Sequence, residues 1–382
     1  MDQQFVDAQG VQIGDHGTQT NHFTMAGQSP AAAELQALHP RAAARRIRGM
    51  PAEDGAALVA QLAVQPAADL LAELLRHDEP ATVAVLTSMY PARAQALIER
   101  LTAVADWLAD LPRAAAEIRT AHDEARAALG DESGPIARVP NRPLTGFRLD
   151  CARGVVHWHG TTGAAVVTGV IHANYVAAWG KPLTSERAGI QRFEHADVHL
   201  RPFGFPVPVS GAVRDLWSAE DGRIGSTLTY AQQEGPSPSG ATGSKQDFAA
   251  GRVSVYATDA FGAFAVSGPV LSRFQKLGGP TGWLGFPVNH EAGDEHEAVQ
   301  QFEAGTIVWR PDRGAIAVPL AIHVAARERG LGSPTGPVRR LGGGADRAQF
   351  FDKRLVTVRD GVAEAWVQPP LDGASTDRAG PG

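Results

Sequence analysis

The sequence contains very little cysteine, little lysine and no excess of positive charge. Of its 382 residues, one is cysteine (Cys151) and four are lysine, and 41 Asp+Glu outnumber 35 Lys+Arg, for a net charge of −6. A single cysteine excludes an intramolecular disulfide framework and any multi-cysteine zinc site. The acidic balance argues against a nucleic-acid partner, because phosphate affinity comes from excess Lys and Arg. Composition therefore excludes several classes and indicates no activity.

Long hydrophobic runs are also missing. The first 25 residues hold acids, amides and glycines where a secretory signal needs a basic start and an apolar core. The most apolar later stretch, residues 163–180, is interrupted by His172 and Asn174 and is too short for a membrane span. We therefore expect no transmembrane segment and a cytoplasmic location. Secretion by a leaderless route, with association to the cell envelope, is the alternative.

Residues 1–30 are rich in amides and glycine and poor in large apolar side chains, which predicts a disordered tail. Within residues 10–23, the alternation Val11-Gln12-Ile13 before Gly14 is typical of a strand. Together with Gln12, the amides of Gln19 and Asn21 can stack as ladders when copies of such a strand add edge to edge. We expect self-assembly through Val11, Gln12, Ile13, Gly14, Gln19 and Asn21.

This stretch resembles the bacterial amyloid signalling motifs related to the RIP homotypic interaction motif, whose core is a β-branched residue, Gln, a β-branched residue and Gly. The resemblance covers about 15 residues and implies homotypic or heterotypic strand pairing with signalling partners. The alternative is a disordered tail without a function of its own.

Residues 31–130 are rich in Ala, Leu and Arg and predict a helical superhelical domain. Proline is favoured in the first turn of a helix, so the regularly spaced prolines mark successive short helices, followed by a longer helix over residues 113–129. These prolines are Pro40, Pro51, Pro66, Pro80 and Pro91. The segments at residues 39–45 and 50–54 resemble the N-domain of MgtE-type magnesium transporters. Too few acidic residues are present to carry over a magnesium site.

After a linker at 131–146, residues 147–367 read as a five-unit repeat array, and 368–382 as a second disordered tail. Each unit starts at a phenylalanine, usually with a nearby upstream glutamine (Gln191, Gln246, Gln301 and Gln349), and continues as a hairpin and a short helix. We expect helices over 269–277 and 319–329. The five phenylalanines are Phe147, Phe193, Phe248, Phe302 and Phe350.

The joint Leu284-Gly285-Phe286-Pro287 resembles the LGFP repeat, which is named for this tetrapeptide. Ile224-Gly225-Ser226-Thr227 and Leu331-Gly332-Ser333-Pro334 are weaker copies. The family occurs mostly in secreted actinobacterial proteins, so the resemblance implies cell-wall association or carbohydrate binding. A hairpin with one helix cannot bury its apolar face alone. We therefore predict a multidomain α + β protein: a disordered tail, an all-α solenoid, and a β-hairpin/helix array closed as a ring or propeller-like body.

No catalytic motif is evident. His290 and His296 flank several carboxylates, but their spacing matches no zinc motif, so we predict no metal, no cofactor and no enzyme. A metal-dependent hydrolase is the alternative that this cluster leaves open.

Aromatic side chains at the ends of units either pack between repeats or stack on sugar rings. For a glycan ligand we predict contacts from Trp283, Asn289, His290, Glu291 and Trp309. The leading functional hypothesis is a non-enzymatic signalling or effector protein of a bacterial immune-type system, recruited through its N-terminal motif. The alternative is a protein that binds the cell envelope or peptidoglycan.

Overall fold

The computed structural model describes residues 28–139, 146–201, 204–220, 223–341, 346–352, 354–359 and 362–367. These residues form two compact units. The first contains the chain up to Glu124 together with residues 131–152 and 158–163. The second contains residues 125–130, 153–157 and the chain from Ala164 onward. The N-terminal motif at residues 10–23 lies outside the described residues.

The N-terminal helices begin where the prolines predict. Pro40 and Pro91 open their helices, Pro51 is an N-cap, and Pro80 lies in a first turn. The helices are α1 (Pro30–Ala37), α2 (Pro40–Arg48), α3 (Ala52–Ala60), α4 (Val64–His77), α5 (Glu79–Thr87), α6 (Pro91–Leu101) and α7 (Leu111–Leu129), with the 3-10 helix η1 (Asp106–Asp110) before α7. The predicted long helix over 113–129 is confirmed by α7.

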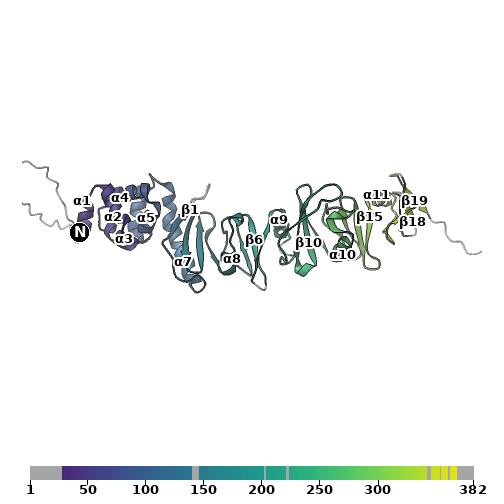
Figure 1. Ribbon diagram of the computed structural model, residues 1–382, viewed down its shortest axis with the longest axis horizontal. Helices are drawn as coiled ribbons and strands as arrows, with labels where there is room; N and C mark the ends of the chain where they lie inside the picture. The colour runs from purple at the N-terminus through teal and green to yellow at the C-terminus, as the bar shows by residue number, and fades with distance from the viewer. Residues whose placement is uncertain are drawn as a thin grey trace, which may run out of the picture. The chain divides into compact units, whose positions relative to one another are not determined.

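Helix α4 is central to the first unit, where it contacts α2, α5 and α6 and buries Leu70, Leu71 and Leu74. Figure 1 shows these helices, coloured purple to blue, packed as one bundle. In the same unit, Trp158 donates from Nε1 to Oε2 of Glu117 at 2.7 Å, and its ring centroid lies 5.9 Å from that of Phe147.

The strands form five separate antiparallel sheets whose strands follow chain order. Their members are β1 (Ala137–Val139), β2 (Gly146–Cys151), β3 (Gly154–His159) and β4 (Gly163–Thr168); β5 (Ile190–Arg192), β6 (Ala196–Leu200) and β7 (Pro206–Ser210); β8 (Gln232–Glu234), β9 (Gly243–Phe248), β10 (Val253–Thr258) and β11 (Gly262–Ser267); β12 (Ala292–Gly293), β13 (Ala298–Phe302), β14 (Gly305–Arg310) and β15 (Gly314–Pro319); and β16 (Arg339–Arg340), β17 (Arg347–Phe351), β18 (Arg354–Arg359) and β19 (Val362–Val367). Strand β1 lies within the segment that the sequence predicts to be a linker.

A helix follows each of the first four sheets: α8 (Gly169–Ala173), α9 (Gly211–Ala219), α10 (Gly268–Lys276) and α11 (Leu320–Glu328). The helices predicted over 269–277 and 319–329 are thus confirmed within a residue or two. Short 3-10 helices are η2 (Ala177–Trp179), η3 (Ala249–Gly251) and η4 (Gly279–Thr281).

Each of these helices is buried against the sheet of the next repeat. Val270, Leu271 and Phe274 of α10 share one apolar cluster with Phe302 and Ile307 of the following sheet. Figure 1 shows α10 between the sheets that contain β10 and β15. The repeats therefore stabilise one another by sequential stacking, as expected for units that cannot bury their faces alone.

The prediction of a closed ring or propeller-like body is not confirmed. Among the described strands, every ladder joins strands of the same repeat, and no closed ring or barrel is formed. The physical reason is that the apolar face of a sheet is covered by the helix of the preceding repeat. The helix of one repeat thus buries the apolar face of the next sheet, and no contact between the first and last repeats is required.

Candidate functional site

Each repeat begins at a turn, here called the joint, that is built on a glycine in the left-handed region. In all five joints an apolar residue precedes this glycine, and its φ lies between 73° and 86°. Glycine adopts this conformation without the steric cost that a Cβ atom brings. The five pairs are Leu129-Gly130, Trp179-Gly180, Ile224-Gly225, Leu284-Gly285 and Leu331-Gly332. The sequence predicts the last three of these joints, and the first two are found only in the structure.

Two residues after each glycine, the chain forms an isolated bridge to the end of a strand or just beyond it. The bridge partners are Cys151, Phe193, Phe248, Phe302 and Phe351. The position that phenylalanine fills in the middle repeats is therefore Cys151 in the first repeat and Phe351 in the last. The prediction of Phe147 and Phe350 for these two repeats is wrong. Phe350 is 38% exposed and Phe351 only 2% exposed, because adjacent strand residues face opposite sides of the sheet.

In the first repeat, Cys151 takes the position that phenylalanine fills in the others. Burial, and then the charges of Glu132 and Asp150, raise the pKa of the Cys151 thiol. The thiolate is the nucleophilic form of cysteine. The protonated side chain of Cys151 is therefore a packing group of the sheet.

A buried glutamine two residues before each phenylalanine joins its repeat to the preceding one. The amide Nε2 atoms of Gln191, Gln246, Gln300 and Gln349 donate to backbone oxygens of the previous sheet: Val166 at 2.9 Å, Pro208 at 3.1 Å, Ala265 at 2.9 Å and Ala317 at 3.1 Å. Each also donates to a carbonyl just after its own joint. The expectation for Gln301 is wrong by one residue. In the first repeat, which follows no sheet of the described residues, this position is Leu149.

A groove of about 580 Å³ opens beside the fourth repeat, within the second unit. Its walls come from β13, β14, α11 and the joint of the fifth repeat. It is lined by Asn289, Ala292, Gly293, Glu297, Val299, Gln301, Val308, His323, Ala326, Arg327, Gly330, Leu331, Gly332, Ser333, Pro334 and Phe351. Gln300 and Gln301 face opposite sides of β13 because they are adjacent strand residues. Gln300 holds the repeats together, and Gln301 faces the groove.

The titratable side chains of the groove differ in how firmly they are held. Ser333 donates from Oγ to Glu297, and Arg310 Nη1 lies 3.5 Å from Oε2 of that carboxylate. Burial, followed by the nearby charge of Arg327, lowers the pKa of His323, so its imidazole is neutral near pH 7. Arg327 is exposed, and among the described residues no hydrogen bond or ion pair holds it.

Of the five residues predicted to bind a glycan, the structure brings only Asn289 into the groove. Its Oδ1 accepts the backbone N–H of Gln301 at 2.8 Å, so the amide also fixes the joint to the sheet. Trp283 is 36% exposed, and Trp309 is half-buried against the apolar cluster that α10 forms with the next sheet. Both lie outside the residues that line the groove.

The other two predicted residues lie in the loop after Asn289. The ring of His290 packs edge-on against Phe264 with centroids 5.0 Å apart, and the side chain of Glu291 is exposed. Sequence reasoning missed Glu297, His323, Arg327 and Ser333. The signal for two of them was present, because His323 and Arg327 are spaced i, i+4 and share a helix face.

The loop over residues 290–297, which holds His290, His296 and several carboxylates, has no metal-binding arrangement. Oδ1 of Asp294 accepts the backbone N–H groups of His296 and Glu297, at 2.8 and 3.1 Å. Within the described part of the chain, no three His, Cys, Asp or Glu side chains lie close enough together to hold a metal ion. In the same part of the chain, no helix is long and apolar enough to cross a membrane.

Residues 232–282 and 284–329 match the LGFP repeat family. The match covers most of the third and fourth repeats, without the joint of the third, and includes one wall of the groove. It does not extend to the N-terminal motif or to the helical region, so the two other resemblances have no support from it. No curated protein matches the chain.

Two solved structures are similar to this chain at low identity. A virginiamycin B lyase from Staphylococcus aureus is 9% identical, with 64% of this chain and 73% of that one covered and a TM-score of 0.12. A streptogramin B lyase is 10% identical, with 64% and 72% covered and a TM-score of 0.13. TM-scores this low support no conclusion about fold or activity.

Proposed function

We propose that this protein is a non-catalytic binding protein whose repeat array holds a glycan of the cell envelope in the groove beside the fourth repeat. One observation carries the proposal. Amide, imidazole, guanidinium and carboxylate groups converge there over an apolar floor, next to repeats that match the LGFP family. LGFP repeats are found in cell-envelope-associated proteins, which favours the envelope over other sources of glycan.

The lining suits a ligand that carries many hydroxyl groups. A hydroxyl both donates and accepts hydrogen bonds, so its site needs groups of both kinds. The amide of Gln301 provides both, Glu297 accepts, and Arg327 donates. Val299 and Val308 form an apolar floor for the C–H face of a sugar ring.

The same lining favours binding without cleavage. Glycoside hydrolysis ordinarily uses two carboxyl groups that flank the scissile bond. Glu297 is the one carboxylate that lines this groove, and it is engaged with Ser333 and Arg310. A hydrolase acting here would lack the second acid or base.

The experiment is a sedimentation assay of the full chain with purified peptidoglycan, followed by calorimetry with soluble muropeptides. We expect Arg327→Ala to weaken binding about tenfold, because a charged hydrogen-bond donor is lost from the site. The control is Arg329→Ala, since Arg329 lies outside the groove and donates to the carbonyl of Ala325 at 3.3 Å. Equal losses in both variants, or no binding by the wild-type chain, contradict the proposal.

The immune-type signalling hypothesis remains a prediction. It depends on strand pairing by residues 10–23, which lie outside the described residues. Both predicted locations, cytoplasmic and envelope-associated, also remain predictions. Fractionation of the producing cells distinguishes them.

A further inference from the structure

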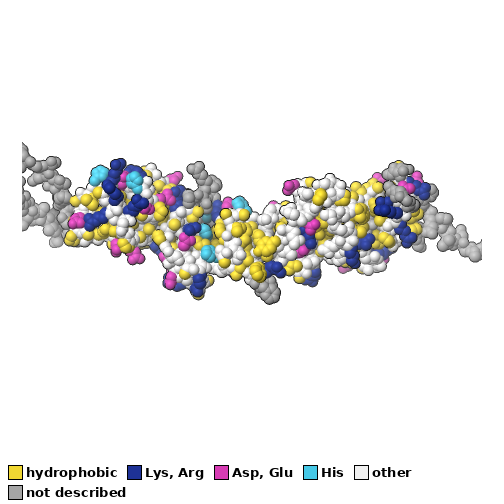
Figure 2. Space-filling model, viewed as in Figure 1, with side chains coloured by type: hydrophobic (Ala, Val, Ile, Leu, Met, Phe, Trp, Pro, Cys, Tyr) yellow, Lys and Arg dark blue, Asp and Glu magenta, His cyan; other side chains and the backbone are white. Residues whose placement is uncertain are grey.

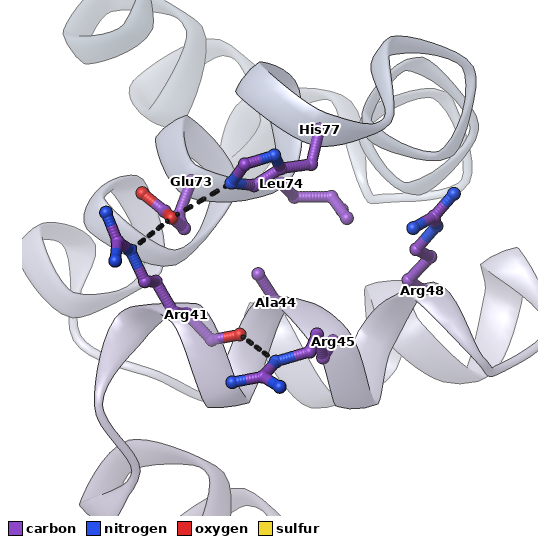
Figure 3. A pocket seen from close by; sticks show the side chains of 7 residues that line it. All are labelled: Arg41, Ala44, Arg45, Arg48, Glu73, Leu74 and His77. Atoms are coloured by element: carbon purple, nitrogen blue, oxygen red, sulfur yellow. Dashed lines mark hydrogen bonds and ion pairs between the residues drawn. The ribbon is translucent and has the colours of Figure 1, made fainter.

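Helices α2 and α4 of the first unit enclose a cleft of about 490 Å³ that belongs to no repeat. Figure 3 shows Ala44 and Leu74 on the two helices that border it, with the polar side chains around them, and both apolar side chains are almost completely buried. The lining residues are Arg41, Ala44, Arg45, Arg48, Glu73, Leu74 and His77. Arginine is thus the most frequent residue of the lining.

Glu73 organises one end of the cleft and is 5% exposed. Its Oε1 accepts from Nε of Arg41 at 3.0 Å and lies 3.2 Å from Nε2 of His77, while Arg76 pairs with Oε2. Burial acts to raise the pKa of Glu73, but the hydrogen bond from His77 and the charges of Arg76 and Arg41 outweigh it and lower the pKa. The carboxylate is therefore ionised and already neutralised by its two arginines.

The remaining donors are available to a ligand. Arg48 binds Oδ2 of Asp78 through Nε at 2.7 Å, and Arg41 binds Glu73 through Nε, so these two ion pairs leave the terminal Nη groups unused. Arg45 donates only to the carbonyl oxygen of Arg41, at 3.4 Å, and has no carboxylate partner among the described residues. The three lining arginines and Arg76 together carry four positive charges. Glu73 and Asp78 carry two negative charges, so the site keeps a net positive charge.

The three lining arginines of α2 follow the period of the helix. Arg41, Arg45 and Arg48 are spaced i, i+4 and i+7, which places them on one face. Figure 2 shows dark-blue basic side chains and cyan histidines gathered on the helical part of the molecule. Guanidinium groups present rigid pairs of N–H donors that match the oxygens of a phosphate.

We propose that this cleft binds a small phosphorylated ligand, with its phosphate on the three arginines of α2. The size of the cleft selects a small ligand, because small-molecule pockets commonly measure about 300–1,000 Å³. Stable docking of a protein partner buries about 1,200 Å² or more of total surface and needs a more extended face. A dianionic phosphate matches the two uncompensated positive charges.

Calorimetry of the full chain at low salt, with inorganic pyrophosphate and with ADP as probes, tests the proposal. We expect both to bind, because both carry the phosphate groups that the three arginines recognise. Arg45→Ala should weaken binding about tenfold and Arg45→Lys by a smaller factor, since lysine keeps the charge but loses the paired donors. Arg45 is exposed, so both variants should fold, which circular dichroism verifies.

The matched control is Arg46→Ala, one residue along the same helix. Arg46 pairs with Glu34 at 3.0 Å and lies outside the cleft, so its loss should change affinity by about twofold or less. Three results would overturn the proposal: no binding of either probe, an Arg46→Ala loss equal to that of Arg45→Ala, or binding of an oligoglutamate peptide without binding of pyrophosphate. The last of these would indicate an acidic protein partner.

Discussion

Gln300 donates its side-chain N–H to the backbone oxygen of Ala265, on the last strand of the preceding repeat, at 2.9 Å. Its second amide hydrogen bond goes to the carbonyl of Asn289 at 3.1 Å. Both contacts recur at Gln191, Gln246 and Gln349. One amide thus joins a repeat both to its own joint and to its neighbour.

We expect Gln300→Leu to lower the free energy of unfolding of the array by about 2 kcal/mol, because two backbone carbonyl groups lose their partner in a buried place. Urea denaturation followed by tryptophan fluorescence measures the change. Gln301→Leu is the control and should cost about 0.5 kcal/mol or less, since its side chain is half-buried on the other face. Equal effects would contradict the assignment of Gln300.

Gly285→Ala tests the joint. Its φ is +73°, and an added Cβ would lie 2.8 Å from Cβ of Glu303. Gly314→Ala separates the two costs, because its φ is +72° and its surroundings are open. We expect about 1 kcal/mol of backbone strain in both variants and about 1–2 kcal/mol more at Gly285, from displacement of Glu303. Thermal unfolding gives the difference, and equal shifts in Tm would show that the contact is unimportant.

Glu303 connects two distant segments. Its Oε1 accepts the backbone N–H of Phe286 at 2.8 Å, and its Oε2 accepts from the hydroxyl groups of Ser237, at 3.0 Å, and Ser239. Glu303→Ala should destabilise the third and fourth repeats by about 2 kcal/mol, because hydrogen bonds to a charged group are lost. Glu328→Ala, at an exposed position of α11, should leave the free energy of unfolding within about 0.5 kcal/mol of wild type. Urea denaturation of both variants provides the comparison.

His199 predicts a dependence of stability on pH. It is 2% exposed, both ring nitrogens are buried without a hydrogen-bond partner, and its ring packs edge-on against Trp217 at 4.7 Å. Burial lowers its pKa below the ordinary 6.5, and the charge of Asp197 opposes this only in part. The unfolded chain therefore binds a proton first, so stability is complete above pH 6.5 and is lost as the pH falls toward the folded pKa.

His199→Phe removes the titrating group and the two unsatisfied nitrogens while keeping an aromatic ring. We expect it to raise the free energy of unfolding by about 1 kcal/mol at pH 7 and to flatten the loss below pH 6.5. His195→Phe is the control, since the side chain of His195 is 63% exposed. An unchanged pH profile in His199→Phe would assign the titration to another group.

The N-terminal motif is tested with a peptide of residues 8–25. If it pairs strands as its resemblance implies, the peptide should form thioflavin-positive fibrils. Gln12→Asp and Ile13→Asp should abolish them, because each places a charge in the stacked strand. A wild-type peptide that stays monomeric at high concentration would remove the basis of the signalling hypothesis.

Local patterns predicted much of the architecture. Prolines located helices α2 to α6 of the first unit, and the hairpin and helix of the third and fourth repeats lie where the sequence places them. Two of the assignments that failed lie between adjacent residues of the same type. Gln300 next to Gln301 and Phe350 next to Phe351 offer two registers of one strand, and a shift by one residue exchanges the buried and exposed faces.

By itself, the sequence determined that the chain holds proline-started helices followed by repeats with a glycine joint, because these signals depend on local backbone preferences. Only the tertiary structure decided that Cys151 belongs to the phenylalanine position, that the described sheets form no closed ring, and that His323 and Arg327 meet Gln301 in one groove. These features depend on which face of a strand is buried and on which repeat covers it. Long-range packing sets both, and the local sequence leaves them open.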